Sequence, residues 1–249
     1  MTGSLFVRMM KQRRRVKAAI FAALVGVVAV VGLDAGADVA HAANGPASPT
    51  AESKPVIVVL GDSLSAEYGL PRDTGWVALM RQRLAAERLD YSVANASISG
   101  DTTSGGLTRL PLVLQRLKPS IVVIELGAND ALRGVPLATT GQNLRTMIAL
   151  IRKANAKPVL VGMYVPPNYG PDYTQHFHAV YGQLSKELHV PLVPFLLAGI
   201  GDRPDLFQSD QMHPTQQAQP LLLDNVWPTL KPLLGNASAQ STPSVPSAH

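Results

Sequence analysis

The sequence contains no cysteine among its 249 residues. This absence excludes disulfide bonds, a thiol nucleophile, cysteine-ligated zinc and a lipid anchor attached to an N-terminal cysteine. A domain without disulfides must be stabilised by its hydrophobic core. Because 46% of the residues are hydrophobic, the chain can form such a core, and its composition is not that of a disordered protein.

The motifs of several common enzyme classes are missing as well. There is no G-x-S-x-G sequence, which excludes an ordinary α/β-hydrolase. The Walker A sequence, the G-x-G-x-x-G fingerprint and a zinc-ligand helix are also absent. His176 and His178 lie two residues apart, but the local pattern is helical, so their rings should point to different sides. We therefore expect neither a cofactor nor a metal ion.

The positive charge is concentrated at the N-terminus. The whole chain carries a formal charge of +5, of which residues 1–42 contribute +4 through six basic and two acidic side chains. Only +1 is left for the remaining residues, so we predict no nucleic-acid partner.

Residues 1–42 have the organisation of an export signal. Basic residues precede an apolar run at 18–33, and small residues precede a predicted cleavage site after Ala42. The apolar run has 16 residues, fewer than the ~20 that span a bilayer. We predict a periplasmic or secreted protein without a stable membrane anchor. Cleavage after Ala37 and an uncleaved anchor are the alternatives.

The remaining chain is predicted to form one domain at 55–234, preceded by a linker at 43–54 and followed by a disordered tail at 235–249. Apolar runs of the kind found in buried parallel strands alternate with helical patterns. Strands are predicted at 56–60, 91–94, 121–126, 158–164 and 192–194. This alternation predicts a mainly parallel sheet with helices on both faces, and functional loops at 61–70, 95–106, 127–137 and 164–173.

Helices are indicated by apolar residues at helical spacing. One stripe consists of Leu144, Met147, Ile148 and Ile151, and a weaker one consists of Val77, Met80 and Leu84. A last helix is predicted at about 214–234, where prolines at 220, 228 and 232 must kink or divide it.

Four polar blocks in this pattern provide the groups that acyl transfer needs. They are "GDS" at 61–63, "NASISGDTTSGG" at 95–106, "GAND" at 127–130 and "SDQMHP" at 209–214. Ser63 follows the first strand and would be the nucleophile, with His213 as its base and Asp210 orienting the histidine. The backbone N–H groups of Ser63 and Gly100 and the side-chain amide of Asn129 would form the oxyanion hole.

Each block also has an ordinary structural interpretation. Gly-Asp-Ser is a common turn, and Ser65 is a second serine two residues further from the strand. Asn129 could cap a helix, Asp210 could belong to a surface turn, and His213 could cap the last helix. Their combination, each in a suitable loop, favours catalysis.

These four polar blocks resemble those of the SGNH, or GDSL-type, hydrolases. More narrowly, the stretches "GDSLSAEYGL", "NASISGDTTSGGL", "ELGANDALRG" and "PPNYGPDY" are similar to those of exported bacterial enzymes with acyl-CoA thioesterase, lysophospholipase and arylesterase activity. The resemblance implies a flavodoxin-like three-layer α/β/α sandwich with five parallel strands. It also implies catalytic roles for Ser63, Gly100, Asn129, Asp210 and His213. The sequence departs from the family pattern at "DQMH", because Gln211 follows Asp210 where many relatives have glycine.

The expected function is that of an exported, monomeric serine hydrolase that forms an acyl-enzyme on Ser63. Its substrates would be small esters or lysophospholipids, with acyl thioesters as a further class. Segments 128–137 and 164–173 would be lids, and the acyl group would lie near Leu64, Leu70, Leu107, Leu132, Val165 and Pro166. A carbohydrate acetylesterase on the same scaffold and a non-catalytic lipid- or glycan-binding protein are the alternatives.

Overall fold

A computed structural model of the chain describes residues 54–235. The predicted export signal and nearly all of the predicted linker and tail therefore lie outside the described residues. None of the helices within 54–235 combines the length and the apolar character that crossing a membrane requires.

The described residues form a five-stranded sheet in which all neighbouring strands are parallel. The strands are β1 (Val56–Gly61), β2 (Ser92–Asn95), β3 (Ile121–Glu125), β4 (Lys157–Val161) and β5 (Leu192–Val193). Their order in the sheet is β2-β1-β3-β4-β5. The direction of the strand order changes between β1 and β3, which is where flavodoxin-like sheets bind their ligands.

The central strands are buried because they are packed on both faces. Every residue of β3 is buried, as are all residues of β1 except Val56. The Val/Ile/Leu runs of these strands are typical of parallel strands that lie between two layers of helices.

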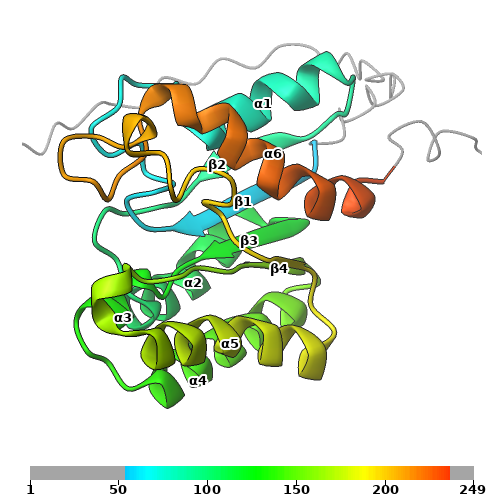
Figure 1. Ribbon diagram of the computed structural model, residues 1–249. Coiled ribbons are helices and arrows are strands. Elements are labelled where there is room, and N and C mark those ends of the chain that lie inside the picture. The colour runs from blue at the N-terminus through cyan, green and yellow to red at the C-terminus, as the bar shows by residue number, and fades with distance from the viewer. Residues whose placement is uncertain (1–53, 236–249) are drawn as a thin grey trace, which may run out of the picture. The chain divides into compact units, whose positions relative to one another are not determined.

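Helices cover both faces of the sheet, so the predicted three-layer sandwich is confirmed. In Figure 1, α1 (Trp76–Ala86) and α6 (Gln219–Leu230) lie on one face, and α2 (Thr103–Leu117), α4 (Leu137–Lys153) and α5 (Pro171–Leu188) lie on the other. The short α3 (Ala128–Leu132) follows β3 directly. Both predicted apolar stripes are buried, the one in α4 and the weaker one in α1.

The C-terminal helix begins later than the sequence predicted. A 3₁₀ turn at Gln216–Ala218 precedes α6, and another at Lys231–Leu233 follows it. Pro220 occupies the first turn of α6, where its missing N–H has no intrahelical acceptor to lose. Thr215 is extended, with φ −70° and ψ 172°, so the helical backbone begins only after this residue and does not reach back to residue 214. Pro228 lies inside α6, which continues past it.

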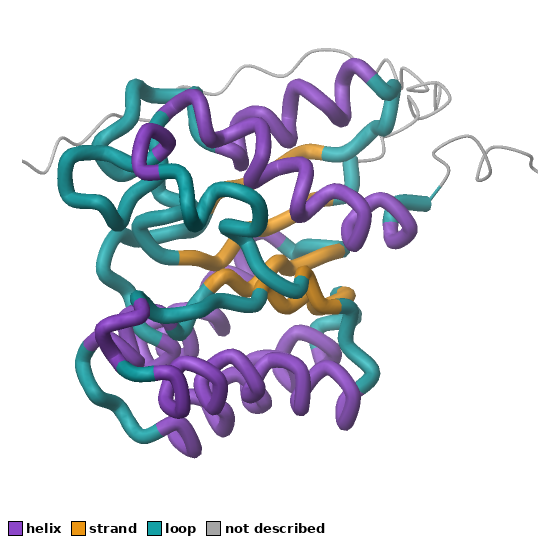
Figure 2. Tube along the Cα trace, in the orientation of Figure 1, coloured by secondary structure: helices purple, strands orange, loops and turns teal. Residues whose placement is uncertain are grey.

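The loops that follow the strands gather at one end of the sheet, on the left in Figure 2. We call this end the carboxyl edge. It carries the segments after β1 and β3 side by side, because Gly61 and Glu125 are paired in the register of the two strands.

Candidate active site

Ser63 lies in a tight turn that begins as β1 ends. The carbonyl of Asp62 accepts the N–H groups of Ser65 and Ala66 at 3.3 and 2.9 Å, and its carboxylate accepts the N–H of Leu64 at 3.1 Å. Gly61 is required because a Cβ there would approach Glu125 Oε2 to 2.7 Å and Ser65 Oγ to 2.8 Å. Close packing behind the turn therefore holds Ser63 at the cavity surface.

His213 connects Ser63 to Asp210. Its Nε2 lies 2.9 Å from Ser63 Oγ, and its Nδ1 lies 2.7 Å from Asp210 Oδ2. Asp210 Oδ1 accepts the N–H groups of Met212 and His213, both at 3.0 Å. Partial burial raises the pKa of Asp210, but these backbone bonds and the histidine outweigh it and lower the pKa to about 2. Asp210 is therefore ionised at neutral pH and can hold the imidazole in one tautomer.

The loop carrying His213 is tied to the turn carrying Ser63. The backbone N–H of Gln208 donates to the carbonyl of His213 at 2.7 Å, and its side-chain amide donates to the carbonyl of Tyr68 at 2.9 Å. The rings of Tyr68 and His213 lie 4.4 Å apart. The sequence analysis did not single out Tyr68 or Gln208, because neither side chain is one of the groups that acyl transfer requires.

The three predicted oxyanion donors line the same cavity. Within 54–235, the N–H groups of Ser63 and Gly100 have no hydrogen-bond acceptor. Gly100 has a φ of +78°, a conformation that glycine adopts without strain. The amide of Asn129 donates one N–H to Asp62 Oδ2 at 2.9 Å and has no second acceptor among the described residues. Each of the three residues that line the cavity thus has one N–H without an acceptor among the described residues.

Ser65, the competing serine, points away from this cavity. Its hydroxyl is buried and donates to Glu125 Oε2 at 2.7 Å, while its carbonyl accepts the amide of Asn95 at 2.7 Å. The structure therefore brings Ser63, and not Ser65, to His213.

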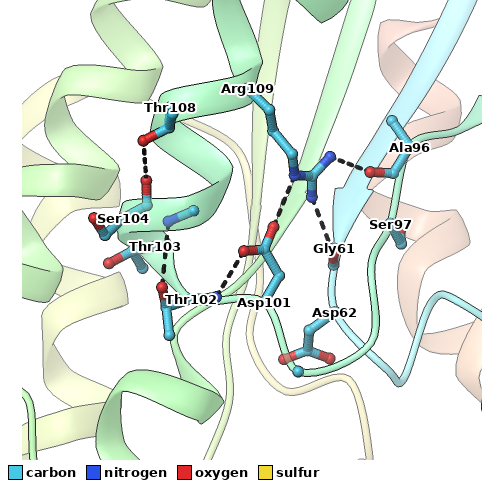
Figure 3. A network of polar contacts seen from close by, with 12 residues as sticks. Gly61, Asp62, Ala96, Ser97, Asp101, Thr102, Thr103, Ser104, Thr108 and Arg109 are labelled. Carbon is cyan, nitrogen blue, oxygen red and sulfur yellow. Dashed lines mark hydrogen bonds and ion pairs between the residues drawn. The ribbon is translucent and has the colours of Figure 1, made fainter. Parts of the chain in front are cut away.

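Arg109 of α2 joins the two loops that carry Ser63 and Gly100 (Figure 3). Its Nε donates to Asp101 at 2.7 Å, its Nη2 donates to the carbonyl of Gly61 at 3.3 Å, and its Nη1 donates to the carbonyl of Ala96. The ion pair with Asp101 is largely buried. One guanidinium group thus holds the end of β1 against the 96–101 loop.

Replacing Arg109 by lysine should therefore weaken both the fold and the site. A lysine ammonium cannot reproduce the planar fork of donors. We expect the free energy of unfolding in urea to fall by about 1–3 kcal/mol. Ester turnover should drop about tenfold, because the donors shift relative to Ser63. Arg116→Lys, on the exposed side of the same helix, is the matched control. Equal behaviour of the two variants would contradict this role for Arg109.

A cavity of about 1030 Å³ opens beside Ser63 and His213. Four of the predicted acyl-site residues line it, namely Leu64, Leu132, Val165 and Pro166. The wall also includes residues that the sequence analysis missed: Met163, Tyr164, Phe195, Leu197, Phe207 and Met212. Three of these, Phe195, Leu197 and Phe207, lie in the chain after β5, a segment that was not among the predicted functional loops.

Two predicted acyl-site residues do not line the cavity. Leu107 packs against the hydrophobic core from α2. Leu70 closes a turn through its N–H bond to the carbonyl of Glu67 at 3.0 Å. Helix α3 and the 3₁₀ turn Pro167–Tyr169 fall within the two predicted lid segments, and both segments contribute to the cavity wall. Their movement as lids stays a prediction.

The helical prediction for the segment around His176 and His178 is confirmed, since both belong to α5. His178 Nδ1 lies 3.2 Å from the carbonyl oxygen of Met163, and its ring stacks on Tyr164 with a centroid distance of 3.8 Å. Tyr164 in turn meets Phe195 edge to face. His178 therefore supports the aromatic wall of the cavity.

The parallel α/β/α sandwich, with Ser63, His213 and Asp210 in contact at the carboxyl edge of its sheet, is an arrangement typical of hydrolases. The model of the GDSL-like lipase/acylhydrolase family matches residues 59–220. The chain belongs to this family and is a carboxylic ester hydrolase.

Similar proteins agree with this assignment. Esterase TesA of Pseudomonas aeruginosa is 53% identical over 178 residues, covering 72% of this chain and 89% of the relative. Thioesterase 1/protease 1/lysophospholipase L1 of Escherichia coli is 41% identical over 182 residues, with coverages of 73% and 86%. The crystal structure of an esterase, EstA of a Pseudoalteromonas species, inhibited by monoethylphosphonate, aligns with a TM-score of 0.69 at 42% identity. This alignment covers 74% of this chain and all of EstA.

Proposed function

We propose that this hydrolase cleaves esters through an acyl-enzyme on Ser63, with His213 and Asp210 completing the catalytic triad. The observation that carries the proposal is the position of the His213 ring, whose two nitrogens reach Ser63 Oγ and Asp210 Oδ2 at 2.9 and 2.7 Å. A serine hydroxyl needs such a base to become nucleophilic.

In the first half of the proposed reaction, Ser63 Oγ bonds to the acyl carbon as His213 Nε2 takes the hydroxyl proton. The carbonyl π electrons move onto oxygen, and the N–H groups of Ser63, Gly100 and Asn129 stabilise the resulting oxyanion. The tetrahedral intermediate collapses, the bond to the leaving group breaks, and His213 protonates the departing alcohol or thiol. Water then repeats these steps on the acyl-enzyme, releasing the acid and restoring the Ser63 hydroxyl.

The cavity supports a preference for extended acyl groups over acetate. Its volume of about 1030 Å³ is larger than a two-carbon acyl group can fill, and its wall is largely apolar. Lysophospholipids, medium-chain esters and acyl thioesters share such an acyl part, and they are the substrate classes that we propose. A carbohydrate acetylesterase would not need this volume.

A series of p-nitrophenyl esters from acetate to octanoate tests this preference. Each methylene buried in the cavity contributes up to ~0.8 kcal/mol, so kcat/KM should rise by up to about fourfold per added methylene until the cavity is filled. We expect the hexanoate and octanoate esters to exceed the acetate ester by about tenfold or more in kcat/KM. A preference for acetate would favour the acetylesterase alternative. Leu112→Ala, an exposed substitution on α2, is the control and should leave the profile unchanged.

We also propose that the protein is exported and works as a monomer without a stable membrane anchor. The basic, apolar and small-residue regions of the first 42 residues support export. N-terminal sequencing of the protein from the producing cells should give a chain that begins at Ala43. A chain that keeps the apolar run would contradict the cleavage, and a dimer in light scattering would contradict the monomer.

A further inference from the structure

Two buried carboxyl groups lie directly behind Ser63. Asp62 precedes the serine, and Glu125 is the last residue of β3; their exposed fractions are 1% and 0%. Acidic side chains are almost never fully buried without a partner that offsets their charge. The proposed mechanism gives neither residue a chemical step, so their burial requires another explanation.

The two carboxyl groups differ in their hydrogen bonds. Asp62 receives two donors, the N–H of Leu64 on Oδ1 at 3.1 Å and the amide of Asn129 on Oδ2 at 2.9 Å. On Glu125, Oε2 receives the hydroxyl of Ser65 at 2.7 Å and the N–H of Asp62 at 3.3 Å. Oε1 of Glu125 is buried and receives no hydrogen bond from any residue within 54–235. An ionised carboxylate oxygen without a hydrogen bond would destabilise the folded state in this position, whereas a protonated oxygen can act as a donor.

No described cation offsets a second negative charge at this place. Arg109 of α2 reaches the neighbouring carbonyl of Gly61 but neither carboxyl group. Tyr181 of α5 donates to the carbonyl of Leu126 at 2.9 Å, and Asp130 of α3 receives the hydroxyl of Thr103. His213 is the remaining titratable group near Asp62, and its ring is engaged by Ser63 and Asp210.

The electrostatic surroundings favour one proton on the pair, held by Glu125. Burial, the charge of Asp62 and a hydrogen bond between the two carboxyl groups act against ionisation, and together they raise the pKa of Glu125 well above its usual range. Burial raises the pKa of Asp62 only to about 6, because the N–H of Leu64 and the amide of Asn129 stabilise its ionised form. Two carboxyl groups in one buried site cannot both ionise at neutral pH.

We infer that Glu125 is a protonated carboxylic acid that donates from Oε1 to the ionised Asp62, and that this pair is the positioning device for the Asn129 amide. The inference rests on the proposed function, in which Asn129 stabilises the oxyanion. With its proton on Glu125, Asp62 keeps both oxygens as acceptors, one for the Leu64 N–H and one for Asn129. One N–H of the Asn129 amide is thereby fixed, which sets the direction of the other toward the cavity.

Two substitutions at Glu125 separate a protonated from an ionised side chain. Glu125→Gln has an NH2 group that donates and an oxygen that accepts on a side chain of the same shape, so it can make the bonds of a carboxylic acid but not those of a carboxylate. We expect kcat within about threefold of the wild type. Glu125→Met keeps the length and removes the polar atoms, and we expect kcat to fall about 10- to 100-fold with little change in KM. Equal losses in the two variants would overturn the inference.

The positioning role is tested by combining these changes with Asn129→Ala. If Glu125 acts through Asn129, Glu125→Met should lower kcat by less than about threefold in the Asn129→Ala background, because no amide is left to position. Full additivity of the two losses would show that Glu125 acts through some other group, and would overturn this part of the inference.

The proton itself can be observed without catalysis. In the catalytically inactive Ser63→Ala protein, infrared difference spectra at neutral pH should show a protonated carboxyl band that disappears in Glu125→Gln. The free energy of unfolding gives an independent measure. A raised carboxyl pKa means that the folded state binds the proton more tightly, so this contribution to stability is lost as pH rises through the folded pKa.

The wild type should therefore lose stability relative to Glu125→Gln as pH rises from about 4.5 to about 7. The inference would be overturned if the stability of the wild type relative to Glu125→Gln stayed constant or rose over this pH range. Absence of the infrared band would overturn it as well. Neither measurement depends on turnover, so both distinguish a failure of this inference from a failure of the proposed mechanism.

Discussion

Ser63→Ala should lower ester hydrolysis by about 10⁴-fold or more while leaving a folded protein. The hydroxyl lies at the cavity surface, and among the described residues its one side-chain partner is His213, so its loss leaves no buried polar group of this part unpaired. The remaining groups of the site can still bind the ester, but no covalent acyl-enzyme can form. kcat for p-nitrophenyl hexanoate and labelling by a fluorophosphonate probe measure the two effects directly.

Two other serines provide the controls for this experiment. Ser92→Ala, on an exposed position of β2, should match the wild type in rate and in labelling. Ser65→Ala removes the hydroxyl that donates to Glu125, so it should lower stability while keeping fluorophosphonate labelling. Retention of labelling in Ser63→Ala, or its loss in Ser65→Ala, would contradict the assignment of Ser63 as the nucleophile.

The positions of the polar blocks could be predicted because the sequence marks the strand ends clearly. A Val/Ile/Leu run that stops at Gly61 or at Gly127 locates the carboxyl end of a parallel strand, and such ends lie at one edge of the sheet. The two blocks then become neighbours in space whatever the loops between them do. This is why Ser63 and Asn129, 66 positions apart in the chain, line the same cavity.

The cavity wall was harder to predict because its residues follow no periodic pattern. Leu70 and Leu107 are apolar residues in the expected loops, yet one closes a turn and the other packs into the core. Phe195 and Phe207 reach the cavity from the irregular chain after a strand of only two residues. Which side an irregular loop presents depends on tertiary packing, and a single sequence does not contain a signal for it.

Glu125 shows a signal that was present but not used. An acidic residue inside the apolar run "IVVIEL" is unusual for a strand buried on both faces, because burying a charge is costly. Such a residue must be neutral or paired. The acidic residue at the end of this run therefore indicates a buried polar site at the carboxyl end of the strand.

Asn129→Ala should lower kcat by about 10²–10³-fold with little effect on KM, because the amide is proposed to bind the oxyanion and not the ground-state ester. The loss corresponds to about 3–4 kcal/mol of transition-state stabilisation. Removing the amide also leaves Asp62 Oδ2 without its donor. The free energy of unfolding should therefore be measured beside the rate, so that a loss of structure is not mistaken for a loss of catalysis.

Asn129→Asp separates the donor from the shape of the side chain. The substitution keeps the volume, but it replaces the amide by a carboxylate that faces both Asp62 and the developing oxyanion. Like charges this close repel each other, so we expect kcat to fall at least as far as in Asn129→Ala. Asn143→Asp, a partly buried asparagine of α4 that donates to the hydroxyl of Thr103 and not to a carboxyl group, is the matched control. A loss below about threefold in Asn129→Ala would remove Asn129 from the oxyanion hole. The two backbone N–H groups of Ser63 and Gly100 would then have to carry the charge alone.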